Sequence, residues 1–196
     1  MVDIEELIYQ DVKAKMANWN QKDIYAVSFF VHVNEEEEYE GYSNLCDFSI
    51  SYNTEADCAG AGEYDEERWN YAFWRQNETP IIDIYEKNEC MKQLMAWYEE
   101  NQITDLGVEN EDCYNSDGDY IGKGPVGEYE LFSIVSDVAA RLQSEHFLSD
   151  KIGKKIPIIV HDIEYNWFAI EATKKANPNG EADIFLESIM KDIDGE

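Results

Sequence analysis

Apolar and polar residues repeat along this chain with two different periods, which predict helices in some segments and strands in others. Apolar side chains recur every three or four residues over four segments: 3–19, 83–101, 126–148 and 182–193. This spacing places them on one face of an amphipathic helix. The sequence therefore predicts four helices, each with one buried face and one charged face.

Two further segments have the composition of β-strands. Residues 24–33 are almost all β-branched, aromatic or otherwise apolar, which is typical of a central strand with both faces covered. Residues 45–52 alternate apolar and polar side chains, as in a strand with one covered face. The acidic segment 34–41 lies between them, so we expect the two strands to form a hairpin.

The remaining segments are shorter or more polar. The apolar run 156–160 predicts a strand that Pro157 places at a strand start or a sheet edge, and 167–170 is a candidate for one more strand. Segments 53–67 and 104–125 contain several glycines and are expected to be loops. This order of elements predicts a single α+β domain over 1–196, with an antiparallel β-sheet covered by helices.

Composition shows that the chain can form a core in spite of its charge. It has 43 acidic residues against 15 Lys and Arg, a formal net charge of -28 and a pI near 4.2. Disordered acidic chains lack apolar residues, but here 44% of the residues are hydrophobic, with 13 Tyr, 8 Phe and 5 Trp. The acids are therefore expected to lie on the surface of a folded domain.

The charge is concentrated in two stretches without any Lys or Arg. The first, 23–67, contains 13 acids, and the second, 93–122, contains eight more. Such a surface repels nucleic acids and anionic membranes and attracts cationic surfaces. The sequence therefore predicts a basic protein as partner, and neither nucleic acid nor membrane; it does not predict an oligomeric state.

The start of the chain and its cysteines favour a cytoplasmic protein. The first ten residues lack the basic and apolar regions of a signal peptide, and the longest apolar run, 24–33, is too short to span a membrane. Cys46, Cys58, Cys90 and Cys113 have no CxxC spacing, so we expect reduced thiols and no bound cofactor.

No segment matches a known catalytic or metal-binding motif, so we assign no catalytic residue and no metal ligand. The loop 113–119 resembles a calcium loop only in part, because Cys113 and Gly124 would stand where carboxylate ligands are required. His161 and Asp162 follow the strand 156–160 directly, at a position where active sites often form. A hydrogen-bonded histidine at the end of a strand is the simpler interpretation.

The predicted partner-binding surface combines acids with aromatic residues. The densest aromatic cluster runs from Trp69 to Trp74 and follows acidic residues, a combination that suits core packing or an anchor for a protein partner. The residues predicted to bind the partner are Glu35, Glu36, Glu37, Glu38, Glu40, Glu63, Asp65, Glu66, Glu67, Trp69 and Trp74.

Several short segments resemble a bacterial family of uncharacterised single-domain proteins, defined only as a domain of unknown function. They are the strand that begins at Ile24, the Asn53-Thr54-Glu55 sequence, Arg68-Trp69-Asn70 with Trp74, and 174–178 near the C-terminus. The resemblance covers about residues 1–178. It implies a cytoplasmic α+β protein, associated with immunity to secreted toxins, and it implies no catalytic residue.

The hypothesis that fits best is a non-enzymatic interaction protein, similar to an immunity protein or an antitoxin, that neutralises a basic toxin. Two alternatives remain open. One is a small metal-dependent hydrolase that uses His161, Asp162 and the loop around Asp117. The other is an acidic globular protein whose charge serves solubility and has no specific partner.

Overall fold

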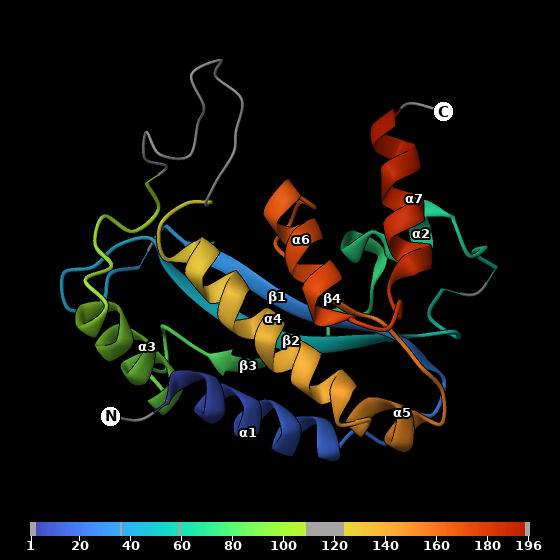
Figure 1. Ribbon diagram of the computed structural model, residues 1–196, viewed down its shortest axis with the longest axis horizontal. Helices are drawn as coiled ribbons and strands as arrows, with labels where there is room; N and C mark the ends of the chain where they lie inside the picture. Colours follow the sequence, from blue (N-terminus) through green and yellow to red (C-terminus); the bar gives the residue numbers. More distant parts are fainter. Residues whose placement is uncertain (1–2, 36, 59, 109–123, 195–196) are drawn as a thin grey trace.

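The computed structural model describes residues 3–35, 37–58, 60–108 and 124–194, and shows a four-stranded sheet with helices on both faces (Figure 1). The strands are β1 (Ile24–Asn34), β2 (Leu45–Thr54), β3 (Thr79–Ile82) and β4 (Ile158–His161). The helices are α1 (Ile4–Ala17), α2 (Glu66–Trp69), the 3-10 helix η1 (Tyr71–Phe73), α3 (Glu89–Glu100), α4 (Glu128–Ser144), α5 (Phe147–Ile152), α6 (Trp167–Ala176) and α7 (Asp183–Asp194). The predicted α+β class is confirmed.

The strand order is β3-β2-β1-β4. β1 and β2 form the predicted antiparallel hairpin, in which Ser28 lies opposite Ser51. β2 pairs with β3 in the antiparallel sense, whereas β4 runs parallel to β1. The sheet is therefore mixed. The C-terminal ends of β1, β3 and β4 lie at the same end of the sheet as the first residues of β2.

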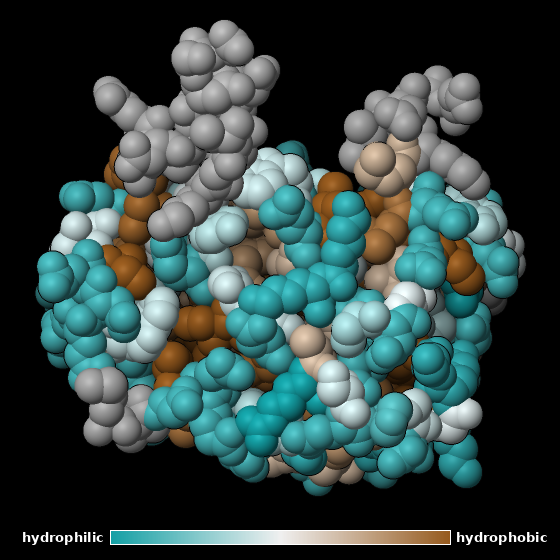
Figure 2. All heavy atoms as spheres, viewed as in Figure 1, coloured by the Kyte–Doolittle hydropathy of each residue, from teal (hydrophilic) through white to brown (hydrophobic). Residues whose placement is uncertain are grey.

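The first side of the sheet carries the main core. Val27, Phe29 and Val31 of β1 belong to this core, together with apolar residues of α1, α3 and α4. α1 begins at Asp3, whose carboxylate accepts hydrogen bonds from the amides of Glu5 and Glu6, as expected of an N-terminal cap. Hydrophilic residues cover most of the outer surface on this side, as Figure 2 shows.

The second side of the sheet has a smaller core with a different composition. Trp69 and Trp74 pack edge-on against Tyr25, and Trp69 also contacts Phe185 of α7. Part of the cover of this side consists of short elements, since α2 has four residues and η1 has three. Buried polar residues, among them Ser28, Ser51 and His161, also lie in the sheet.

The sequence-based expectations about secondary structure differ from the structure in several places. Residues 167–170 are not a strand but the first turn of α6, where the Asn166 side chain accepts a hydrogen bond from the Ala169 amide. The helix expected to begin at residue 83 begins at Glu89, because 83–88 form a turn capped by Asp83. The strand β3, with Pro80 at its second position, was not predicted.

Candidate functional site

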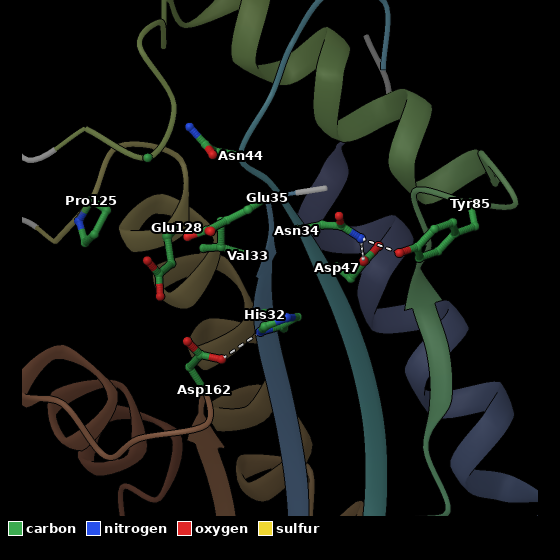
Figure 3. A pocket seen from close by; sticks show the side chains of 11 residues that line it. His32, Val33, Asn34, Glu35, Asn44, Asp47, Tyr85, Pro125, Glu128 and Asp162 are labelled. Carbon is green, nitrogen blue, oxygen red and sulfur yellow. Dashed lines mark hydrogen bonds and ion pairs between the residues drawn. The ribbon is translucent and has the colours of Figure 1, made fainter. Parts of the chain in front are cut away.

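A large cavity lies at the end of the sheet where β1, β3 and β4 end and β2 begins (Figure 3). Its volume is about 900 Å³. Ligands of sheet proteins commonly bind outside the carboxyl ends of parallel strands. We call this end of the sheet the hairpin end, and define it as residues 34–35, 37–47, 83–88, 102–108, 124–128 and 162–164.

Carboxylates dominate the wall of this cavity. Glu35, Asp47, Glu128 and Asp162 line it, and among its described lining residues there is no Lys or Arg. Glu128 is only 6% exposed and occupies the first turn of α4, where the positive end of the helix dipole favours a carboxylate. The cavity is therefore suited to a cationic group.

Two hydrogen-bonded pairs hold the carboxylates in place. Asp162 follows β4 and its Oδ1 lies 3.2 Å from Nδ1 of His32 on β1, as drawn in Figure 3. Asp47 accepts hydrogen bonds from the Ile84 amide at 2.7 Å and from the Asn34 side chain at 3.3 Å. Burial raises the pKa of Asp47 in spite of these donors, so keeping a negative charge there costs folding free energy.

An aromatic side chain stands at the rim of the cavity. Tyr85 is 63% exposed, and its hydroxyl accepts a hydrogen bond of 3.1 Å from the Asn34 side chain. Tyr85 thus presents an oriented ring beside Asn34 and Asp47 (Figure 3). Exposed aromatic rings next to carboxylates suit ammonium and guanidinium groups, because a cation is attracted by both.

The carboxylates are spread around the wall and do not converge on one point. In the described ranges, no group of three His, Cys, Asp or Glu side chains is placed to hold a metal ion. The calcium-like loop 113–119 lies outside the described residues. The cavity geometry thus fits an extended organic cation better than a single metal ion.

The predicted acidic residues of the first stretch lie at this hairpin end. Glu35 lines the cavity, and Glu37, Glu38 and Glu40 are exposed on the loop between β1 and β2. Glu36 lies outside the described residues. Within the described part of the chain, none of the ion pairs involves these side chains.

The other predicted acids lie at the opposite end of the sheet, which we call the far end (residues 55–67 and 153–157). Figure 1 shows the hairpin loop on the left and the segment after β2 on the right. β2 has 10 residues, so its two ends lie roughly 30 Å apart at about 3.3 Å per residue. Glu63, Asp65, Glu66 and Glu67 therefore do not form one surface with Glu35, Glu37, Glu38 and Glu40, and the binding of a partner by either group stays a prediction.

Charge at the far end is partly neutralised within the chain. The Arg68 guanidinium forms two hydrogen bonds with Glu55, of 2.9 and 3.0 Å, and lowers the pKa of Glu55. Lys154 lies 3.4 Å from the same carboxylate, and Arg75 lies 3.3 Å from Asp57. Within the described residues these ion pairs neutralise Glu55 and Asp57, and none of them involves Glu63, Asp65, Glu66 or Glu67.

The two tryptophans predicted as binding anchors are core residues. Trp69 and Trp74 are each 5% exposed, and their indole N–H groups donate to the backbone carbonyls of Glu63 and Arg68. They have little surface to offer a partner. The exposed aromatic residue nearest to them in sequence is Phe73, which is 55% exposed.

His161 and Asp162 are adjacent in sequence but face different parts of the molecule. Asp162 lines the cavity, whereas His161 is 1% exposed and hydrogen-bonded to Ser28. The two side chains therefore do not form a joint metal site, and Asp117 lies outside the described residues. Sequence reasoning missed His32, Asp47, Tyr85 and Glu128, although His32 was recognisable as a polar residue near the end of an apolar strand.

Comparisons with protein-family models, with curated proteins and with solved structures found no match for this chain. None of the helices in the described ranges is both long and apolar enough to cross a membrane.

Proposed function

We propose that this protein is a binding protein whose hairpin end takes up a basic protein partner, in the manner of an immunity protein or an antitoxin. The observation that carries the proposal is the cavity of about 900 Å³ with four carboxylates in its wall and no Lys or Arg among its described lining residues. Basic toxins that act on nucleic acids need cationic surfaces, and such surfaces fit this end.

Charge and shape act at different steps of the proposed binding. The net charge of -28 attracts a basic partner over several ångströms and raises the association rate, more so at low salt. The exposed loop acids Glu37, Glu38 and Glu40 then meet the partner first. A lysine or arginine side chain of the partner enters the cavity between Glu128 and Asp162, and a second one packs against Tyr85 beside Asp47.

The experiment compares charge reversal at the two ends of the sheet. One variant carries Glu37→Lys, Glu38→Lys and Glu40→Lys; its matched control carries Glu63→Lys, Asp65→Lys and Glu67→Lys. Both change the net charge by the same amount at exposed positions. The probe is a fluorescein-labelled nona-arginine peptide, and stopped-flow anisotropy measures its association rate at several salt concentrations.

We expect the hairpin-end variant to lower the association rate about tenfold and to flatten its salt dependence, because the steering charge is removed. The far-end variant is expected to change the rate less than about threefold. Equal losses in the two variants would mean that only the total charge matters. That outcome would support the alternative of an acidic surface that serves solubility.

A further inference from the structure

A second polar site lies inside the molecule, between the sheet and its short cover on the second side. Ser28 of β1, Ser51 of β2 and His161 of β4 are at most 3% exposed. Ser28 and Ser51 lie directly opposite each other in the β1–β2 register. The other face of β1 is occupied by Val27, Phe29 and similar residues. Buried polar side chains in this position lower the stability of the fold unless they form hydrogen bonds or serve a function.

Ser28 and His161 are arranged as a nucleophile and its base. Ser28 Oγ lies 2.7 Å from His161 Nε2, and His161 Nδ1 lies 2.7 Å from the backbone oxygen of Asp162. A carbonyl oxygen can only accept, so Nδ1 carries the proton and Nε2 must accept from the serine hydroxyl. A hydroxyl, a base and a third group that orients the base are the parts of an activated serine. The sequence offered no such partner for His161, because Ser28 is 133 residues away.

The protonation state of the histidine agrees with this arrangement. Burial lowers the pKa of His161 to about 4, so the ring is neutral at pH 7 and able to take a proton from Ser28. Water that reached the ring would raise its pKa toward the ordinary value and make it a stronger base.

Several aromatic rings pack around the histidine of this pair: the centroids of Phe30 and Tyr165 lie 5.4 and 5.7 Å from that of His161, and Tyr71 is closer still. The centroid of the Tyr71 ring lies 4.7 Å from that of His161, and the Tyr71 hydroxyl donates to Glu78. Tyr71 belongs to η1, a three-residue helix without a buried residue. The Tyr71 side chain also interacts with the hydroxyls of Ser28 and Ser51, so its rotation would free one side of the Ser28–His161 pair without breaking the sheet.

One atom in the same layer points to a missing donor. Asn53 follows Ser51 by two residues on β2 and so faces the same side. Its amide nitrogen donates to the Tyr25 hydroxyl, but among the described residues its buried Oδ1 has no hydrogen-bond donor. Buried acceptors are nearly always paired in proteins, so this oxygen is available to a polar group of a bound molecule.

We propose that Ser28 is a nucleophile with His161 as its base, and that Tyr71 gates its access to small esters. Ser28 Oγ attacks the carbonyl carbon while its proton moves to His161 Nε2. Ser51, opposite Ser28, interacts with Tyr71 while the pair is covered, and after rotation of Tyr71 it offers its hydroxyl to the oxygen that becomes negative. The bond to the leaving alcohol breaks, His161 returns the proton to that alcohol, and a water molecule later releases the acid from Ser28 by the same route. No metal or cofactor takes part in these steps.

The test uses diisopropyl fluorophosphate on the full chain, with the modified peptide identified by mass spectrometry. Ser28 attacks phosphorus, fluoride leaves, and the serine proton is taken up by His161. We expect slow modification of Ser28 in the wild type and at least about tenfold faster modification in Tyr71→Ala, because the ring that covers the pair is removed. Phe73→Ala, in the same short helix but at an exposed position, is the matched control and should react like the wild type.

Two further variants make the outcome decisive. Ser28→Ala should lose the modification at this peptide, and His161→Gln should slow it by about a hundredfold or more, since a general base contributes roughly 10² or more to such a reaction. If Tyr71→Ala fails to fold, as judged by circular dichroism, the test uses the wild type after long incubation. Its rate of Ser28 modification is then compared with that of His161→Gln. Absence of any modification at Ser28 in the folded wild type and in folded Tyr71→Ala would overturn the proposal. So would a rate that is unchanged in His161→Gln.

Discussion

At the far end of the sheet Glu55 and Asp57 each meet a basic side chain, whereas at the hairpin end Glu37, Glu38 and Glu40 take part in no ion pair within the described residues. Both ends derive from the same stretch of sequence without Lys or Arg. The difference arises because the fold brings Arg68, Arg75 and Lys154 to one end only.

This contrast separates charge that supports the fold from charge that does not. At the far end Arg68 joins Glu55 to the ring of Tyr25, which lies 4.0 Å from the guanidinium carbon. At the hairpin end the carboxylates line a cavity, and burial raises the pKa of Asp47. Charged groups that lower the stability of the fold and line one cavity commonly have a role in binding. This agrees with the proposed function.

Acidification should produce the largest effect, because it discharges both ends and also charges a buried histidine. The pKa of His161 falls from 6.5 to about 4 on folding, so the unfolded chain binds more protons between these values. The stability that depends on a neutral His161 is complete above pH 6.5. It is lost as the pH falls toward 4, by about 3 kcal/mol in total. Urea unfolding at pH 7.5 and pH 4.5 measures the loss.

Comparison with two variants assigns this loss to one ring. His161→Gln is expected to be less stable than the wild type at pH 7.5 but to lose less stability on acidification. The exposed His146 provides the control, and His146→Gln should keep the pH dependence of the wild type. Equal pH dependence in the wild type and His161→Gln would contradict the assignment.

The next largest effect is expected from Arg68, the residue that neutralises the far end. Its side chain is 14% exposed and forms a two-pronged contact with Glu55. Arg68→Ala should lower the free energy of unfolding by about 2 kcal/mol, since both the charged hydrogen bonds and the packing on Tyr25 are lost. Arg75→Ala is the matched change at an exposed pair and should cost less than about 1 kcal/mol. Thermal and urea unfolding of both variants test this ranking, which similar losses in the two would contradict.

The sequence predicted those elements in which the period of apolar residues was long enough to read. The strands 24–33 and 45–52 and their hairpin are confirmed by β1 and β2. β3 has four residues including Pro80, which is too short for a period of two to show. The apolar run 167–170 has the composition of a strand, and the Asn166 cap that starts a helix there was the overlooked signal.

The candidate sites were harder to predict, because they depend on which strand ends meet. The parallel pairing of β4 with β1 brings Asp162 to His32 and His161 to Ser28, and no local pattern announces this pairing. For the same reason, adjacency in sequence suggested one acidic surface where the fold makes two. Acids near each end of a ten-residue strand are neighbours in the sequence but lie far apart in space.

The smallest effect, and the most direct test of the hairpin end, concerns Asp47. Its pKa is raised by burial, so the folded protein gives up this proton at a higher pH than the unfolded chain, and stability is lost as the pH rises above 3.8. Asp47→Asn keeps an oxygen for the Ile84 amide and removes the charge. It should therefore stabilise the protein at pH 7 by up to about 1 kcal/mol, given that the site is partly exposed to solvent.

At pH 3 the advantage of Asp47→Asn should vanish, because the wild-type carboxyl is then protonated in both states. Asp83→Asn is the matched control, since Asp83 also accepts hydrogen bonds from backbone amides, of Tyr85 and Glu86, but does not line the cavity. It should change stability by less than about 0.5 kcal/mol. If Asp47→Asn instead destabilised the protein at pH 7, this carboxylate would support the fold as Glu55 does. The contrast between the two ends would then fail at Asp47.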